Sequence, residues 1–137
     1  MEYLFAESKS VSPEELSALF TDVGWGQQSA QKLQRSIDAY PFVAHARTET
    51  GLLVGYISAF SDEVFSTLLG ELVVHPDYQR KGIATNLLAR LEARFPSAPV
   101  YIKALGEAKK FFVAQGYKAP RIELTVLFKS PSSTCDA

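Results

Sequence analysis

The chain has 137 residues, of which 47% are hydrophobic and 12% aromatic, which is enough to build one domain around a packed core. Its formal net charge of -1 excludes the strongly basic surface by which proteins bind nucleic acid or anionic membranes. No apolar run approaches the roughly 20 residues that cross a bilayer, and the single cysteine, Cys135, excludes an internal disulfide.

The two ends of the chain indicate where the protein works. The N-terminus lacks the basic segment and apolar stretch of a signal peptide, and an unpaired cysteine suits a reducing compartment. We therefore expect a cytoplasmic protein. Residues 1–129 are predicted to form a single domain, and the polar residues 130–137 a flexible tail.

The first forty residues predict one strand and two helices. Tyr3 to Ala6 is a short apolar run that suits a strand. Ser12 can cap the first helix, and Glu15, three residues later, completes a capping box. Ser29 can cap the second helix, which must end before Pro41 because proline cannot continue it.

Three strands are expected next. Phe42 to Arg47 and Leu52 to Ser61 read as a hairpin whose loop contains Gly51. Val64 to Val74 is a longer strand, and Gly70 inside it predicts a β-bulge.

The remaining elements alternate between strand and helix. After a long helix that ends near Arg94, Val100 to Ile102 predicts a buried strand and Gly106 to Gln115 a short helix. Ile122 to Phe128 alternates between apolar and polar residues, as a last strand would. The order β-α-α-β-β-β-α-β-α-β predicts an α/β sheet with helices on both faces.

The stretch from Glu71 to Arg94 carries the chemistry. An apolar strand ends at Pro76, and helical spacing begins near Ile83. The junction offers backbone N–H groups without intrahelical partners at the positive end of the helix dipole. Gly82 lets a phosphate approach the backbone closely, and the preceding Arg-Lys pair adds charge. An ordinary helix start with a solvated basic pair would have the same residues.

Two motifs resemble a known family. Val74-x-x-x-x-Gln79-x-x-Gly82-x-Ala84 resembles the acetyl-CoA signature of the GNAT superfamily of acetyl-CoA-dependent N-acyltransferases. The segment Ala108 to Tyr117, a helix followed by Gly-aromatic, is similar to the second landmark of that family. The resemblance extends over roughly Val43 to Phe128 and is looser in the first forty residues.

The resemblance implies a fold, a co-substrate and a binding site. The sheet would be mixed and mainly antiparallel, with the fourth and fifth strands splayed so that the pantetheine arm of acetyl-CoA lies between them. No metal is implied. The residues expected to bind the co-substrate are Leu72, Val73, Val74, Gln79, Arg80, Lys81, Gly82, Ile83, Ala84, Thr85, Phe111 and Phe112.

Acetyl transfer to an amine needs a group that takes the amine's proton, because an alkylammonium titrates near 10.4. Glu71 is the first candidate, since it lies in an apolar strand just before the expected co-substrate contacts. It could equally be an acid on a partly exposed strand face. Asp62, Glu63 and His75 are weaker candidates.

The chain departs from the family pattern in the second landmark. Many family members have a tyrosine four residues before the glycine, where it can protonate the leaving thiolate, and this chain has Phe112 there. The asparagine usual at the start of that helix is also missing, and Leu105-Gly106-Glu107 occupy the region. These departures put the family's general acid in doubt. Tyr117, after the glycine, matches the usual phenylalanine and suits the core.

The acceptor pocket is less defined. Its candidate side chains, each of which could instead be part of the core, are Trp25, Tyr40, Tyr56, Phe60 and Phe65, with Asp62 beside them.

The resemblance implies an N-acetyltransferase that moves an acetyl group from acetyl-CoA to a primary amine by direct attack in a ternary complex. The amine could be a small molecule, such as an arylalkylamine or a polyamine, or a protein or peptide amine. The alternative is a CoA-binding regulatory module that has lost efficient turnover. A nucleotide-phosphate binder is a third reading, but neither the P-loop nor the three-glycine dinucleotide motif is present. No nucleic-acid or membrane partner is expected, and a homodimer is left open.

Overall fold

The computed structural model describes residues 2–131, so Cys135 and most of the tail predicted over residues 130–137 lie outside the described residues. The elements in chain order are β1 (Tyr3–Ala6), α1 (Pro13–Asp22), α2 (Ala30–Ala39), β2 (Phe42–Thr48), β3 (Leu53–Ser61), β4 (Thr67–Val74), the 3-10 helix η1 (Pro76–Tyr78), α3 (Ile83–Arg94), β5 (Val100–Tyr101) and α4 (Ala108–Ala114). The described residues fall into two compact units that divide after Ile102. The single domain predicted over residues 1–129 therefore stays a prediction.

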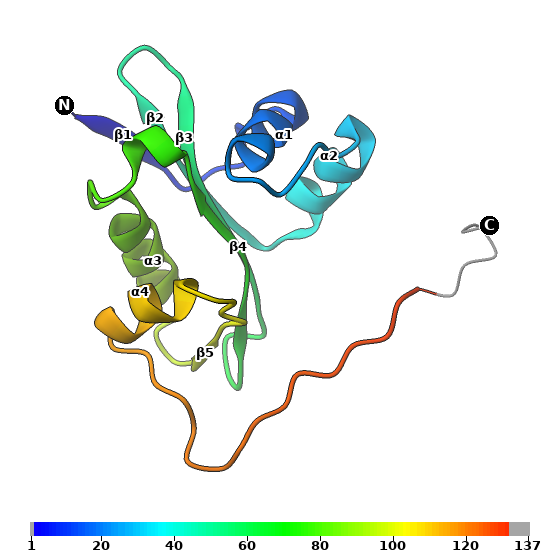
Figure 1. The fold of residues 1–137 in the computed structure, drawn as a ribbon, viewed down its shortest axis with the longest axis vertical. Coiled ribbons are helices and arrows are strands. Elements are labelled where there is room, and N and C mark those ends of the chain that lie inside the picture. Colours follow the sequence, from blue (N-terminus) through cyan, green and yellow to red (C-terminus); the bar gives the residue numbers. More distant parts are fainter. Residues whose placement is uncertain (1, 132–137) are drawn as a thin grey trace. The chain divides into compact units, whose positions relative to one another are not determined.

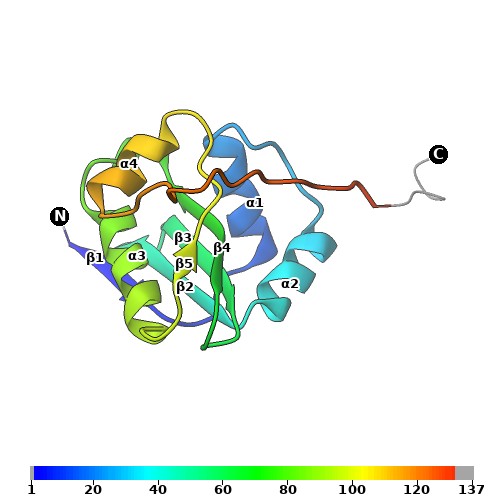
Figure 2. The same cartoon turned by 90° about the horizontal axis from the view of Figure 1, so that it is seen from below.

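The first unit is built on a five-stranded sheet with the order β1-β2-β3-β4-β5. The first three pairs are antiparallel, and β5 joins β4 in parallel. Figures 1 and 2 show α1 and α2 on one face of the sheet and α3 on the other. The predicted α/β fold, with a mixed and mainly antiparallel sheet between helices, is confirmed.

Apolar side chains at helical spacing hold α1 and α2 to the sheet. Leu16 and Leu19 of α1 and Ile37 of α2 are at most 2% exposed and join one cluster with Tyr56 of β3. Each buried aliphatic side chain contributes about 1.5–3 kcal/mol relative to an exposed one. On the opposite face, α3 lays the side chain of Ile83 over Gly55 of β3. The position of each helix thus follows from its apolar stripe.

The start of α1 agrees with the predicted capping box. The Ser12 hydroxyl accepts the Glu15 N–H at 3.1 Å, and the Glu15 carboxylate accepts the Ser12 N–H at 3.0 Å. Arg47 of β2 donates to the same carboxylate and joins the helix to the sheet. The hydrogen bond from Arg47 is the main reason why the pKa of Glu15 falls to about 2.

The strand β4 starts later than predicted and contains the predicted bulge. It begins at Thr67 because Asp62 accepts the N–H groups of residues 64–66 on one carboxylate oxygen and turns the chain there. Ala59 pairs with Leu69 and Ile57 with Leu72, so two residues of β4 lie opposite one residue of β3. These two residues are Gly70 and Glu71.

The strands β4 and β5 share only two residue pairs, Thr67 with Val100 and Leu68 with Tyr101. From Leu69 onward, that edge of β4 has no strand partner among residues 2–131. This short pairing agrees with the predicted splay between the fourth and fifth strands.

The predicted last strand, Ile122 to Phe128, is wrong. No helix or strand follows α4 in the described residues, and the apolar side chains of this segment are 60–88% exposed. Alternation of apolar and polar residues favours a strand, but a strand also needs a neighbouring strand for its backbone hydrogen bonds.

Within residues 2–131, no helix is long and apolar enough to cross a membrane.

Candidate functional site

The loop between β4 and α3 is closed by one side chain and shaped by two residues with left-handed backbone. The Gln79 side-chain amide donates to the Val74 carbonyl at 3.0 Å. Arg80 and Gly82 have φ angles of 64° and 85°. Gly82 precedes α3 and supplies no side-chain cap. The first turn of α3 therefore keeps backbone N–H groups that have no hydrogen-bond partner within the helix.

The charges of this loop face solvent. Arg80 and Lys81 are exposed, and neither forms an ion pair within the described part of the chain. Ile83 is 1% exposed and anchors the helix in the core, whereas Thr85 is exposed. The loop therefore combines helix N–H groups with two available cations, an arrangement that suits a diphosphate.

The strand before this loop offers backbone rather than side chains. Val73 and Val74 are buried, and Leu72 and Ala84 are half-buried. Since β5 pairs with β4 only at its beginning, the Leu72–Val74 backbone lies along an edge without a strand partner in residues 2–131. Such an edge can hydrogen-bond an extended ligand.

Glu71 is held on both carboxylate oxygens. The Tyr40 hydroxyl donates to Oε2 at 2.7 Å, and the Ser58 hydroxyl donates to Oε1 at 3.1 Å. The Ser58 oxygen also accepts the Glu71 N–H at 3.0 Å. Burial, and then the bond to Glu71, raise the pKa of Tyr40 to about 12, so the phenol remains a donor at neutral pH. The carboxylate is half-buried and fixed in orientation, as a base should be.

Ser58 was not predicted from the sequence, and Tyr40 was predicted only as an aromatic that lines a pocket. Apart from the phenol of Tyr56, Ser58 is the one polar side chain within the buried part of β3, residues 53–59, and this is the signal that could have found it.

The predicted acceptor residues lie in different surroundings. Phe60 is 46% exposed, with its ring centroid 4.3 Å from that of Tyr40. Trp25 is 49% exposed and packs on Phe20. Tyr56 is fully buried, its hydroxyl has no partner among the described residues, and burial raises the pKa of its phenol. Of the six predicted residues, Tyr40 bonds Glu71 directly, and the ring of Phe60 and the cluster that contains Tyr56 both pack against Tyr40.

The side chains of the weaker candidates for a base are engaged in other hydrogen bonds or ion-pair contacts. His75 Nδ1 accepts the Asp77 N–H at 3.1 Å, so Nε2 carries the proton and faces Asp22 at 3.3 Å. Asp62 holds its loop with three backbone bonds, which lower the pKa of its carboxyl. Glu63 faces Arg94 at 3.6 Å.

Phe111 and Phe112 lie on α4, in the second unit. The Phe112 ring packs edge-on against those of Phe111 at 5.1 Å and Tyr117 at 5.7 Å. No hydroxyl stands at position 112 of this cluster. Throughout residues 2–131, no three His, Cys, Asp or Glu side chains are grouped to hold a metal ion.

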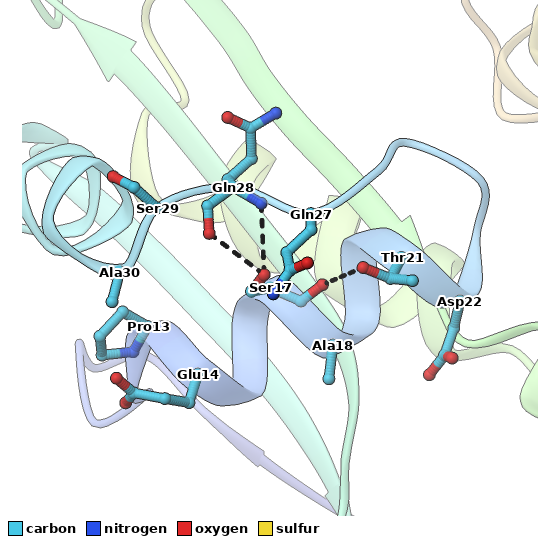
Figure 3. Close-up of a pocket in the computed structure, with 10 residues that line it drawn as sticks. All are labelled: Pro13, Glu14, Ser17, Ala18, Thr21, Asp22, Gln27, Gln28, Ser29 and Ala30. Atoms are coloured by element: carbon cyan, nitrogen blue, oxygen red, sulfur yellow. Dashed lines mark hydrogen bonds between the residues drawn. The ribbon is translucent and has the colours of Figure 1, made fainter.

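A groove of about 610 Å³ lies between α1 and the chain that leads into α2. Figure 3 shows Ser17 bound to Gln28 across it. Asp22 at its edge is the partner of His75. None of the residues predicted for either substrate lines this groove. Its lining residues are Pro13, Glu14, Ser17, Ala18, Thr21, Asp22, Gln27, Gln28, Ser29 and Ala30.

The sequence of this chain is similar to a family of known proteins and to two curated relatives. A family model described as an acetyltransferase (GNAT) domain matches residues 8–125. An uncharacterized N-acetyltransferase, ycf52, from Gracilaria tenuistipitata var. liui is 29% identical over 84 residues, which make up 59% of this chain and 46% of that protein. The chain spans about half the length of the curated relatives that it matches.

Solved structures share the fold. A GNAT-family acetyltransferase from Streptococcus pneumoniae superposes with a TM-score of 0.78 at 21% identity, covering 93% of this chain and 98% of the other. An aminoglycoside 6'-N-acetyltransferase complexed with coenzyme A superposes with a TM-score of 0.62 at 22% identity, covering 74% and 61%.

Proposed function

This chain belongs to the GNAT family of acetyltransferases, and from that premise we propose that it moves the acetyl group of acetyl-CoA to a primary amine. One observation carries the proposal. The same strand, β4, presents the fixed carboxylate of Glu71 and leads, three residues later, into the loop and helix start suited to a diphosphate. The proposed proton acceptor therefore lies on the strand that leads directly into the proposed co-substrate site.

The residues of the loop fit acetyl-CoA. The N–H groups from Arg80 to Ala84 would hold the pyrophosphate, with Arg80 and Lys81 adding charge. A side chain at Gly82 would project into open space, so nothing crowds the backbone there. The edge backbone of Leu72 to Val74 would hold the pantetheine arm. A structural relative was solved in complex with coenzyme A, which supports a CoA co-substrate for this chain.

When bound, acetyl-CoA supplies an activated acetyl group. The amine nitrogen bonds to the acetyl carbon while the carbon–sulfur bond breaks, and the sulfur leaves with the electron pair. The Glu71 carboxylate takes the proton that the amine loses and passes it to solvent. Placement of the amine about 3 Å from the acetyl carbon can lower the activation barrier by several kcal/mol. A thiol that titrates near 8.5 can leave as thiolate without a protein acid.

A second candidate function rests on Phe112. Without a phenol at this position, the chain could be a CoA-binding regulatory module without efficient turnover. Under the transferase proposal, Phe112→Tyr should change kcat by less than about tenfold, because the thiolate leaves unaided. A much larger gain would indicate that the native site lacks an essential donor.

A screen of primary amines, followed by release of free thiol from acetyl-CoA, tests the function. A calorimetric isotherm for CoA is measured beside it. Binding together with transfer to at least one amine supports the transferase. Tight CoA binding without transfer to any amine in a broad screen supports the regulatory module. Absence of CoA binding by the folded protein contradicts both.

A further inference from the structure

Three exposed apolar side chains form a row across the sheet. Phe60 of β3 is paired with Leu68 of β4, which is paired with Tyr101 of β5. Side chains directly opposite one another on neighbouring strands share a face of the sheet. The three are 42–49% exposed. Phe60 also contacts Tyr40, at the end of α2, so the row lies on the face that carries α2. Contiguous exposed apolar side chains often mark a binding surface.

The bulge in β4 brings a carboxylate to this row. Side chains alternate between faces along a strand, and the extra residue at Gly70 reverses that alternation, so Glu71 shares the face of Leu68. The bonds from Tyr40 and Ser58 to Glu71 establish that orientation. Tyr40 therefore touches both parts of the surface, with its hydroxyl on Glu71 and its ring against Phe60.

We propose that Glu71 and the row Phe60, Leu68 and Tyr101 form the acceptor site. This site takes a primary amine on an uncharged aryl or alkyl skeleton, and Tyr40 is the positioning residue that orients Glu71. The inference rests on the proposed function and narrows its substrate. The ammonium group lies at the carboxylate, and the carbon skeleton covers the row.

The chemistry of the surface separates this class from other amines. The row carries no charge, so the second ammonium of a polyamine would be desolvated against Phe60 and Leu68 without a counter-ion. An aryl or alkyl group instead removes apolar surface of the row from water. The acceptor should thus be selected by its carbon skeleton once its nitrogen is held.

Affinity and selectivity test the site. In the CoA complex, binding of 2-phenylethylamine and of spermidine is measured by calorimetry, and their kcat/KM values by thiol release. We expect a preference of about tenfold or more for 2-phenylethylamine. Phe60→Ser should reduce that preference by about tenfold and leave CoA affinity unchanged. A preference for spermidine, or an unchanged preference in Phe60→Ser, overturns the substrate class.

Three variants test the positioning role. Tyr40→Phe keeps the ring and removes the bond to Glu71, so kcat should fall at least tenfold while the amine KM stays within about twofold. Gly70→Ala places a methyl group against the Tyr40 hydroxyl and should likewise lower kcat while the amine KM stays nearly constant. Tyr3→Phe is the control, because it removes a buried hydroxyl that has no partner in residues 2–131.

The outcomes separate this inference from the function on which it rests. If the wild type is active and Tyr40→Phe keeps its kcat, or if Tyr3→Phe loses as much kcat as Tyr40→Phe, the positioning role is overturned and the transferase is left intact. A wild type that binds 2-phenylethylamine through Phe60 but transfers no acetyl group keeps the acceptor site and overturns the transferase.

Discussion

Replacement of Gly82 by valine tests the co-substrate loop most sharply. Gly82 has φ 85°, a region that a β-branched residue adopts only at a cost of about 1–2 kcal/mol, and a Cβ there meets no atom within 4 Å. The variant should therefore fold, with a local shift of the backbone at the start of α3. That shift should remove one or two charge-assisted hydrogen bonds from loop N–H groups to the pyrophosphate.

The expected loss follows from those bonds. A hydrogen bond to a charged group is worth about 1.5–3 kcal/mol, and 1.4 kcal/mol is a factor of ten in affinity. The Kd for CoA, measured by isothermal titration calorimetry, should rise about 10-fold or more. Gly51→Val is a matched control, since Gly51 also has a positive φ, 96°, and open space around it, but lies in the β2–β3 hairpin. It should lose similar stability and keep full CoA affinity.

Two results would refute the reasoning. If Gly82→Val is folded and binds CoA like the wild type, the loop is not the phosphate site. If Gly51→Val loses as much affinity as Gly82→Val, the effect reports general stability and not the loop.

The remaining predictions concern charge and proton transfer. Arg80→Ala and Lys81→Ala should each raise the KM for acetyl-CoA several-fold, because an exposed ionic contact is worth at most about 1 kcal/mol. The KM for the amine should stay unchanged. A change confined to the amine KM would instead place both residues at the acceptor site. Glu71→Gln should lower kcat at pH 7 about 100-fold, with partial recovery at high pH as the amine deprotonates unaided, and a normal rate from pH 6 to pH 9 would remove Glu71 from the mechanism. Because the pKa of Glu15 falls from 4.5 to about 2, its bond to Arg47 stabilises the fold above pH 4.5 and loses its effect as the pH falls toward 2. The Tm difference between wild type and Glu15→Gln should therefore be largest above pH 5 and should close by pH 2; a constant difference would contradict the assignment.

Local features of the fold were predictable from the sequence. The capping box at Ser12 and Glu15 depends on residues three apart in the chain, and Pro76 and Gly82 mark a strand end and a helix start by their own backbone preferences. Gly70 likewise indicated the bulge.

Features that depend on partners far apart in the chain were not predictable. The sequence drew attention to Glu71, but its bond to Tyr40 spans 31 positions, and its bonds to Ser58 require the register of β3 on β4. The segment Ile122 to Phe128 has the alternation of a strand, and pairing, which alternation does not determine, is what makes a strand.

Transfer of a labelled acetyl group tests the central claim most directly. The protein is incubated with acetyl-CoA that carries a deuterated acetyl group and with 2-phenylethylamine, and the amine is analysed by mass spectrometry. The account predicts a labelled amide that accumulates with enzyme and is about 100-fold slower to form with Glu71→Gln. Free CoA released without labelled amide, or amide formed as fast by Glu71→Gln as by the wild type, would contradict it.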